Sequence, residues 1–134
     1  MTTLTSVYRG ELRTESTHTR SGNTLITDAP VDNKGKGEAF SPTDLVCTAL
    51  STCMLTTMGI WADKEGLDMT GMQVEVVKVM ASNPRKIAEI QVRLMHPDLR
   101  ASDEQKEKLK EIAHTCPVAL SLHETVKQTV QFDF

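Results

Sequence analysis

The stretch from residue 41 to residue 64, SPTDLVCTALSTCMLTTMGIWADK, decides the fold. Ser41 suits the N-cap of a helix, Pro42 the first helical position, and Asp44 the third position of a capping box. Apolar residues then recur at helical spacing as far as Trp61, and others extend the apolar surface around the opposite side. A helix that is apolar nearly all round is buried on most of its faces. Because a chain of 134 residues can hardly provide so much cover, this helix predicts an oligomer.

The segments on either side of this helix predict an α+β fold with antiparallel strand pairing. Turn-forming residues, period-two alternation of apolar and polar residues, and a second capping box at Ser102 and Gln105 mark the boundaries. The expected order is two strands within residues 2–28 with a turn at 20–23, a loop over 29–40, the long helix, strands over 69–80 and 86–96, a helix over 101–116, a short helix over 117–124 and a strand over 125–134.

Composition narrows the class of protein. The length is that of one domain, which we expect to span residues 1–134. A net charge of −3 provides no basic field for nucleic acid or for an anionic membrane. The N-terminal residues lack a signal pattern, and polar residues interrupt every apolar stretch before the roughly 20 residues that a membrane span needs. These features predict a soluble cytoplasmic protein.

The three cysteines are an odd number, which argues against a structural disulfide framework in a reducing compartment. Cys53 lies in the apolar helix, and Cys116 also falls on an apolar helical face, followed by Pro117. Each could be an ordinary buried residue, because free cysteine is often buried. Alternatively, two thiols that face the core from different elements could meet as a nucleophile and a resolving thiol. Cys47 lies about 240° around the helix from Cys53, so we interpret it as structural.

The histidines offer a rival site. His114, Cys116, His123 and Cys53 could together hold zinc, but their spacing matches no standard zinc module. We therefore expect neither a metal ion nor another cofactor.

Two motifs carry a family resemblance: GKGEAFSPTDLVCTALSTCM over residues 35–54, and HTCPVALSL over residues 114–122. They resemble the OsmC/Ohr family of osmotically inducible and organic-hydroperoxide-resistance proteins, in its broader OsmC-like branch. The resemblance implies an intertwined homodimer with long central helices, and thiol-dependent reduction of organic hydroperoxides, with hydrogen peroxide as a further candidate, in oxidative stress defence. It also implies that Cys53 attacks the peroxide, that Cys116 forms a disulfide with it, and that an external dithiol such as a lipoylated protein resets the pair.

By the same resemblance, Arg20 in the TRSGN turn would stabilise the thiolate and bind the peroxide. The family pairs this arginine with a glutamate ten residues before the first cysteine, where this chain has Thr43. The neighbouring Asp44 is better explained as a helix cap, and Glu38 in the preceding loop is a further candidate. The departure at Thr43 leaves an alternative open, in which the protein senses oxidants or binds a small hydrophobic ligand without catalysis.

Overall fold

The computed structural model describes all 134 residues, and the chain divides into two compact units, Met1–Val46 and Cys47–Phe134. The first unit is built mainly from an antiparallel sheet in the order β1-β2-β3. Its elements are β1 (Leu4–Gly10), β2 (Arg13–His18), β3 (Thr24–Asp28) and a short 3-10 helix, η1 (Val31–Asn33).

The expectation of two strands before the long helix was wrong, because a tight turn divides the first stretch in two. Glu11 and Leu12 form this turn, and both have positive φ values, 54° and 64°. Hairpin turns with this backbone are usually marked by Asn-Gly or Asp-Gly, so the Glu-Leu pair gives no turn signal in the sequence. The second turn, expected at residues 20–23, is present between β2 and β3, where the His18 amide donates to the Asn23 carbonyl at 2.8 Å.

The first unit contains no buried apolar side chain. Its buried residues are the polar Thr27, Asp28 and Ser41. Its strands and turns nevertheless expose six large apolar residues, which are Leu4, Val7, Tyr8, Leu12, Leu25 and Ile26. A three-stranded sheet needs a buried hydrophobic face to be stable in water, so this sheet requires cover that it does not supply itself.

The second unit contains a sheet in the order β4-β5-β6, formed by β4 (Gln73–Ala81), β5 (Lys86–Met95) and β6 (Lys127–Asp133). β4 and β5 pair antiparallel as expected, but β6 runs parallel to β5. The prediction of purely antiparallel pairing was therefore wrong for the last strand. The chain passes through two helices between β5 and β6 and re-enters the sheet in the same direction, as parallel crossovers do.

Three helices accompany this sheet: α1 (Pro42–Lys64), α2 (Asp103–His114) and α3 (Pro117–Ser121). Both predicted capping boxes are present. At α1 the Ser41 amide donates to Asp44 Oδ2 at 3.0 Å, and the Asp44 amide donates to Ser41 Oγ at 3.1 Å. At α2, Ser102 and Gln105 make the same reciprocal pair.

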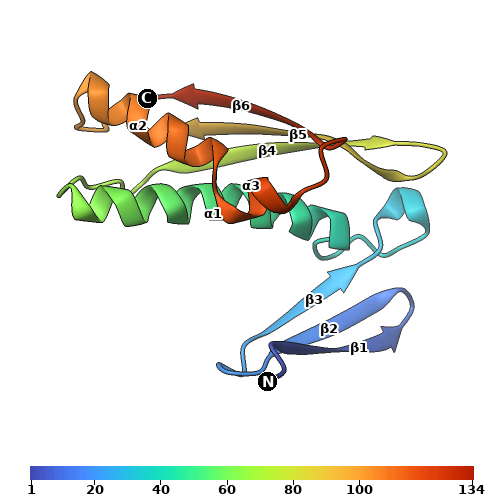
Figure 1. The fold of residues 1–134 in the computed structure, drawn as a ribbon. Helices are drawn as coiled ribbons and strands as arrows, with labels where there is room; N and C mark the ends of the chain where they lie inside the picture. Colours follow the sequence, from blue (N-terminus) through green and yellow to red (C-terminus); the bar gives the residue numbers. More distant parts are fainter. The chain divides into compact units, whose positions relative to one another are not determined.

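The core of the second unit lies on one face of the sheet, where the helices pack (Figure 1). Buried apolar side chains on β5 alternate with the exposed Gln91 and Arg93 on the outer face. The largest buried side chains are Leu50, Met54, Met58, Ile90, Leu94 and Leu109. The other side of α1 stays open, and Ile60 there is 55% exposed. The all-round apolar helix is thus covered on one side by its own chain.

α1 also meets the length and hydropathy of a membrane-spanning helix, which the sequence interpretation did not expect. A single such helix is weak evidence, because the core helix of a water-soluble protein passes the same test. Six residues of α1 are buried within the protein: Cys47, Leu50, Ser51, Met54, Met58 and Ala62.

Candidate functional site

The structure brings Cys53 and Cys116 together within the second unit. Cys53 lies on α1 and is half-buried, whereas Cys116 is fully buried at the N-cap of α3. Both thiols are reduced, and the two side chains lie close enough for Cys53 to raise the pKa of the Cys116 thiol. Pro117 at the first position of α3 stops the chain from continuing α2, and this break turns the Cys116 side chain toward α1.

The two thiols have different surroundings. Burial raises the pKa of Cys116, the backbone N–H of Ala119 opposes that rise, and the neighbouring Cys53 raises the pKa further. The N–H of Val118 also favours the thiolate, although neither amide is near enough to make a capping hydrogen bond. Because burial dominates, Cys116 holds its proton. Cys53 is the more exposed of the two thiols.

Thr57 is the third member of this group, and sequence reasoning missed it. Its Oγ1 donates to the Cys53 carbonyl at 2.8 Å and lies 3.9 Å from Cys53 Sγ. The signal was present as a threonine four residues after the cysteine, since residues at this spacing share a helix face. Cys47 is buried and is not among the groups that shift the pKa of Cys116.

The first unit holds a separate charged cluster around Arg13. Its guanidinium donates to both carboxylate oxygens of Asp28, at 2.7 and 2.8 Å, and to Glu38 Oε2 at 3.3 Å. Hydrogen bonds from Arg13 hold the pKa of Asp28 below its usual range, and Asp28 likewise holds the pKa of Arg13 above its usual value. The Glu38 amide also donates to Asp28, so the loop is tied to the sheet.

The loop that carries Glu38 is tightly folded. A side chain at Gly35 would place its Cβ 1.7 Å from the Ala29 carbonyl oxygen, so only glycine fits there. The Gly37 amide donates to the same carbonyl at 3.2 Å. This fold positions Glu38 beside Arg13.

The other predicted residues of the first unit lie as follows. Arg20 is exposed in the turn between β2 and β3, which is the second turn of the sheet. Glu38 pairs with an arginine as suggested, but that arginine is Arg13. Thr43 has its hydroxyl 3.2 Å from Ser41 Oγ, and Asp44 serves as the helix cap.

The histidines of the rival zinc site have other partners. His114 packs edge-on against Phe132, with ring centroids 5.7 Å apart. His123 Nδ1 lies 2.8 Å from Thr125 Oγ1. No three metal-binding side chains converge anywhere in the structure.

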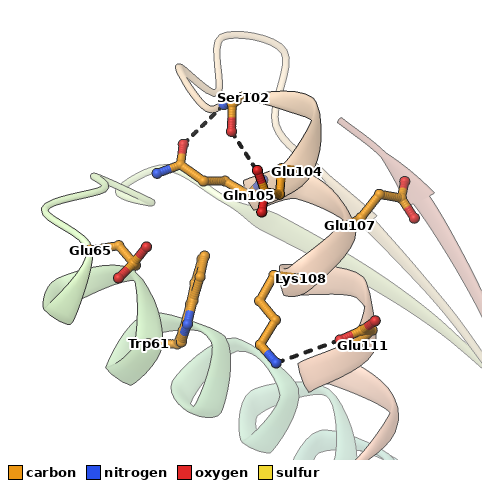
Figure 2. A pocket seen from close by; sticks show the side chains of 8 residues that line it. All are labelled: Trp61, Glu65, Ser102, Glu104, Gln105, Glu107, Lys108 and Glu111. Carbon is orange, nitrogen blue, oxygen red and sulfur yellow. Dashed lines mark hydrogen bonds and ion pairs between the residues drawn. The ribbon is translucent and has the colours of Figure 1, made fainter.

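A hollow of about 600 Å³ lies between α1 and α2 (Figure 2). Trp61 and Glu65 line it from α1, and the α2 side contributes residues between Ser102 and Glu111, among them Lys108. Lys108 pairs with Glu111 at 3.6 Å and is the one cation beside several glutamates. The hollow contains no thiol, and its negative charge disfavours anionic substrates such as fatty-acid hydroperoxides.

Comparison with known proteins places the chain in a family. The family model for OsmC-like proteins matches residues 35–131, a stretch that contains both Cys53 and Cys116. The chain belongs to the OsmC-like family. No curated protein matches the sequence.

Solved structures of OsmC-like proteins share the fold. A protein from Psychrobacter arcticus, with a proposed role in osmotic stress and detoxification, is 46% identical, with a TM-score of 0.94, covering 98% of this chain and 96% of its own. The organic hydroperoxide resistance protein OsmC of Legionella pneumophila, also described as a predicted redox protein, is 18% identical, with a TM-score of 0.73 and coverage of 100% and 98%. The organic hydroperoxide resistance protein of Elizabethkingia anophelis is 12% identical, with a TM-score of 0.65 and coverage of 99% and 96%.

Proposed function

We propose that this OsmC-like protein is a thiol peroxidase that reduces organic hydroperoxides through Cys53 and Cys116. One observation carries the proposal: two reduced thiols from different elements lie close together, one half-buried and the other fully buried. An accessible attacking thiol beside a protected resolving thiol is the arrangement that reversible peroxide chemistry needs. Relatives described as organic hydroperoxide resistance proteins support the same conclusion.

The first step is attack by the Cys53 thiolate on the outer oxygen of the hydroperoxide. A sulfur–oxygen bond forms, the oxygen–oxygen bond breaks, and the alkoxide leaves as an alcohol after it takes up a proton. Cys53 is thereby oxidised to a sulfenic acid and the peroxide is reduced. The half-buried position of Cys53 gives the substrate access and limits contact with water.

The second step joins the two cysteines. The Cys116 sulfur attacks the sulfenic sulfur of Cys53, a disulfide forms, and the hydroxyl group leaves as water with the Cys116 proton. Because the two side chains already lie close together, little movement is needed. An external dithiol, for which we propose a lipoylated protein, then reduces the disulfide by thiol–disulfide exchange.

Arg20 remains the arginine that we propose for binding the peroxide and stabilising the Cys53 thiolate, because a guanidinium lowers the energy of nearby anionic sulfur. Its exposed turn leaves it free to approach a ligand. Three reduced cysteines also suit the reducing cytoplasm, where we propose that the protein acts.

We further propose that the protein acts as a homodimer. The first unit has no apolar interior, its strands and turns expose six large apolar side chains, and α1 leaves Ile60 uncovered. Exposed apolar surface on this scale is typical of protein interfaces. A second copy of the chain would supply the missing cover.

The alternative is a redox sensor or carrier of small hydrophobic ligands that does not turn over. Thr43 favours it, since a carboxylate at that position would hold the arginine in place. Thr43→Glu separates the two functions. A sharp rise in peroxidase rate identifies an attenuated enzyme, whereas an unchanged, negligible rate supports the sensor or carrier.

The test of the proposed function is steady-state consumption of cumene hydroperoxide with dihydrolipoamide as reductant. We expect turnover by the native protein, none by Cys53→Ser, and at most a single oxidation event in Cys116→Ser. Hydrogen peroxide is the matched comparison and should react more slowly. Turnover by Cys53→Ser, or no turnover by the native protein, would refute the proposal.

A further inference from the structure

We infer that Thr57 is a positioning residue, which stabilises the Cys53 thiolate by redirecting its hydroxyl hydrogen to the sulfur. The inference deepens the proposed function and rests on it in one respect, that Cys53 is the attacking thiol. Its starting point is geometric. Thr57 Oγ1 lies within hydrogen-bonding reach of sulfur, 3.9 Å from Cys53 Sγ, on the adjacent turn of α1.

In the resting state the hydroxyl hydrogen is committed to the backbone. Thr57 Oγ1 donates to the Cys53 carbonyl at 2.8 Å, so only its lone pairs remain available to the thiol. A hydroxyl has one hydrogen to donate. This arrangement suits a protonated Cys53, whose S–H can point toward the Thr57 oxygen or toward Cys116.

Ionisation of Cys53 reverses the preference. The proton leaves to solvent, and the anionic sulfur becomes a stronger acceptor than a neutral carbonyl. Rotation of the hydroxyl group alone moves its hydrogen from the carbonyl to the sulfur, without a change of rotamer. Threonine back-bonding to a helix carbonyl is at best neutral for helix stability, so giving it up costs little.

Thr57 and Cys116 then act on the sulfur together. Cys116 keeps its proton because burial raises its pKa, so its S–H can donate to the Cys53 thiolate. Thr57 supplies a second donor to the same sulfur. In a half-buried site each donor counts for more than it does in water.

The chain offers a matched control in Thr52. Its hydroxyl donates to the Thr48 carbonyl at 2.7 Å, the same back-bond on the same helix. It is exposed, and none of its hydrogen bonds involves a thiol. Thr52→Val therefore reproduces the effect of Thr57→Val on the helix alone, and Thr57→Ser retains the hydroxyl at the site.

The test measures the rate at which iodoacetamide alkylates Cys53 from pH 5 to pH 10 in the full-length protein, with peptide mass spectrometry to distinguish the three cysteines. No peroxide is involved, so the result is independent of turnover. For Thr57→Val we expect a rate about three- to tenfold lower at pH 7, as for the net loss of one typical hydrogen bond, and an unchanged limiting rate at high pH.

Thr57→Ser should restore the native rate, and Thr52→Val should match the native protein. Circular dichroism verifies folding, and Thr57→Ala replaces the valine variant if that variant does not fold. The inference is overturned if Thr57→Val keeps the native pH profile, if Thr52→Val shifts it equally, or if the limiting rate falls by the same factor as the rate at pH 7.

Discussion

Oxidation by a single equivalent of peroxide should remove two of the three thiols in the chain, and Cys47 should be the one that remains. The structure sets these numbers. Cys53 and Cys116 lie close together, whereas Cys47 is 5% exposed and takes no part in that pair. The count after unfolding should therefore fall from three to one in the native protein. Dihydrolipoamide should restore all three.

Two variants make the count specific. Cys116→Ser begins with two thiols and should end with one, and Cys53 should then form an adduct with dimedone, which traps sulfenic acids. Cys53→Ser also begins with two and should lose neither. The assay is titration with a chromogenic disulfide in denaturant, after treatment with cumene hydroperoxide. If the native protein retains all three thiols, or if Cys53→Ser loses as many as the native protein, the pairing is not a working redox site.

Three further predictions concern stability and assembly. Arg13 holds the pKa of Asp28 below its ordinary value of about 3.9. The contribution of Asp28 to folding stability is therefore complete above about pH 3.9 and is lost as the pH falls toward the pKa of the folded state. Thermal unfolding from pH 7 to pH 2 should show this loss, and Asp28→Asn should weaken it. Ile60→Glu places a charge on the open side of α1 and should shift sedimentation from dimer to monomer, whereas an unchanged dimer would exclude that face as the interface. Leu94→Ala leaves a cavity at a fully buried position on β5 and should lower the free energy of unfolding, measured by urea titration, by about 2–5 kcal/mol. A decrease below about 1 kcal/mol would contradict this prediction.

Much of the fold follows from local signals. The long helix, its cap at Ser41 and Asp44, and the second capping box at Ser102 and Gln105 are confirmed, because capping depends on residues only three apart. The Glu11–Leu12 turn was not predicted, because two non-glycine residues adopt the left-handed backbone conformation there. The parallel direction of β6 was not predicted either, since the alternation of apolar and polar residues identifies a strand but not its direction.

The candidate site shows the same division. Spacing placed Cys53 on a core-facing helix, whereas Cys116, also expected on a helix, is the extended N-cap residue of α3. The closeness of the two thiols depends on how α1 and α3 pack, which no local pattern contains. Arg13 was passed over for Arg20, because its partner Asp28 is distant in sequence and meets it only through strand pairing. Asp28 itself gave no signal, being one of several acidic residues beside a loop.

The all-polar interior of the first unit also affects the order in which the two units fold during synthesis. The residues from Met1 to Val46 leave the ribosome first, yet they contain no apolar nucleus around which to collapse. The later residues, from Cys47 onward, carry all the buried apolar side chains and can condense alone. During synthesis the leading segment should therefore stay open to proteases and chaperones until apolar surface becomes available to cover it. Ordering should proceed from the end of the chain back toward its beginning.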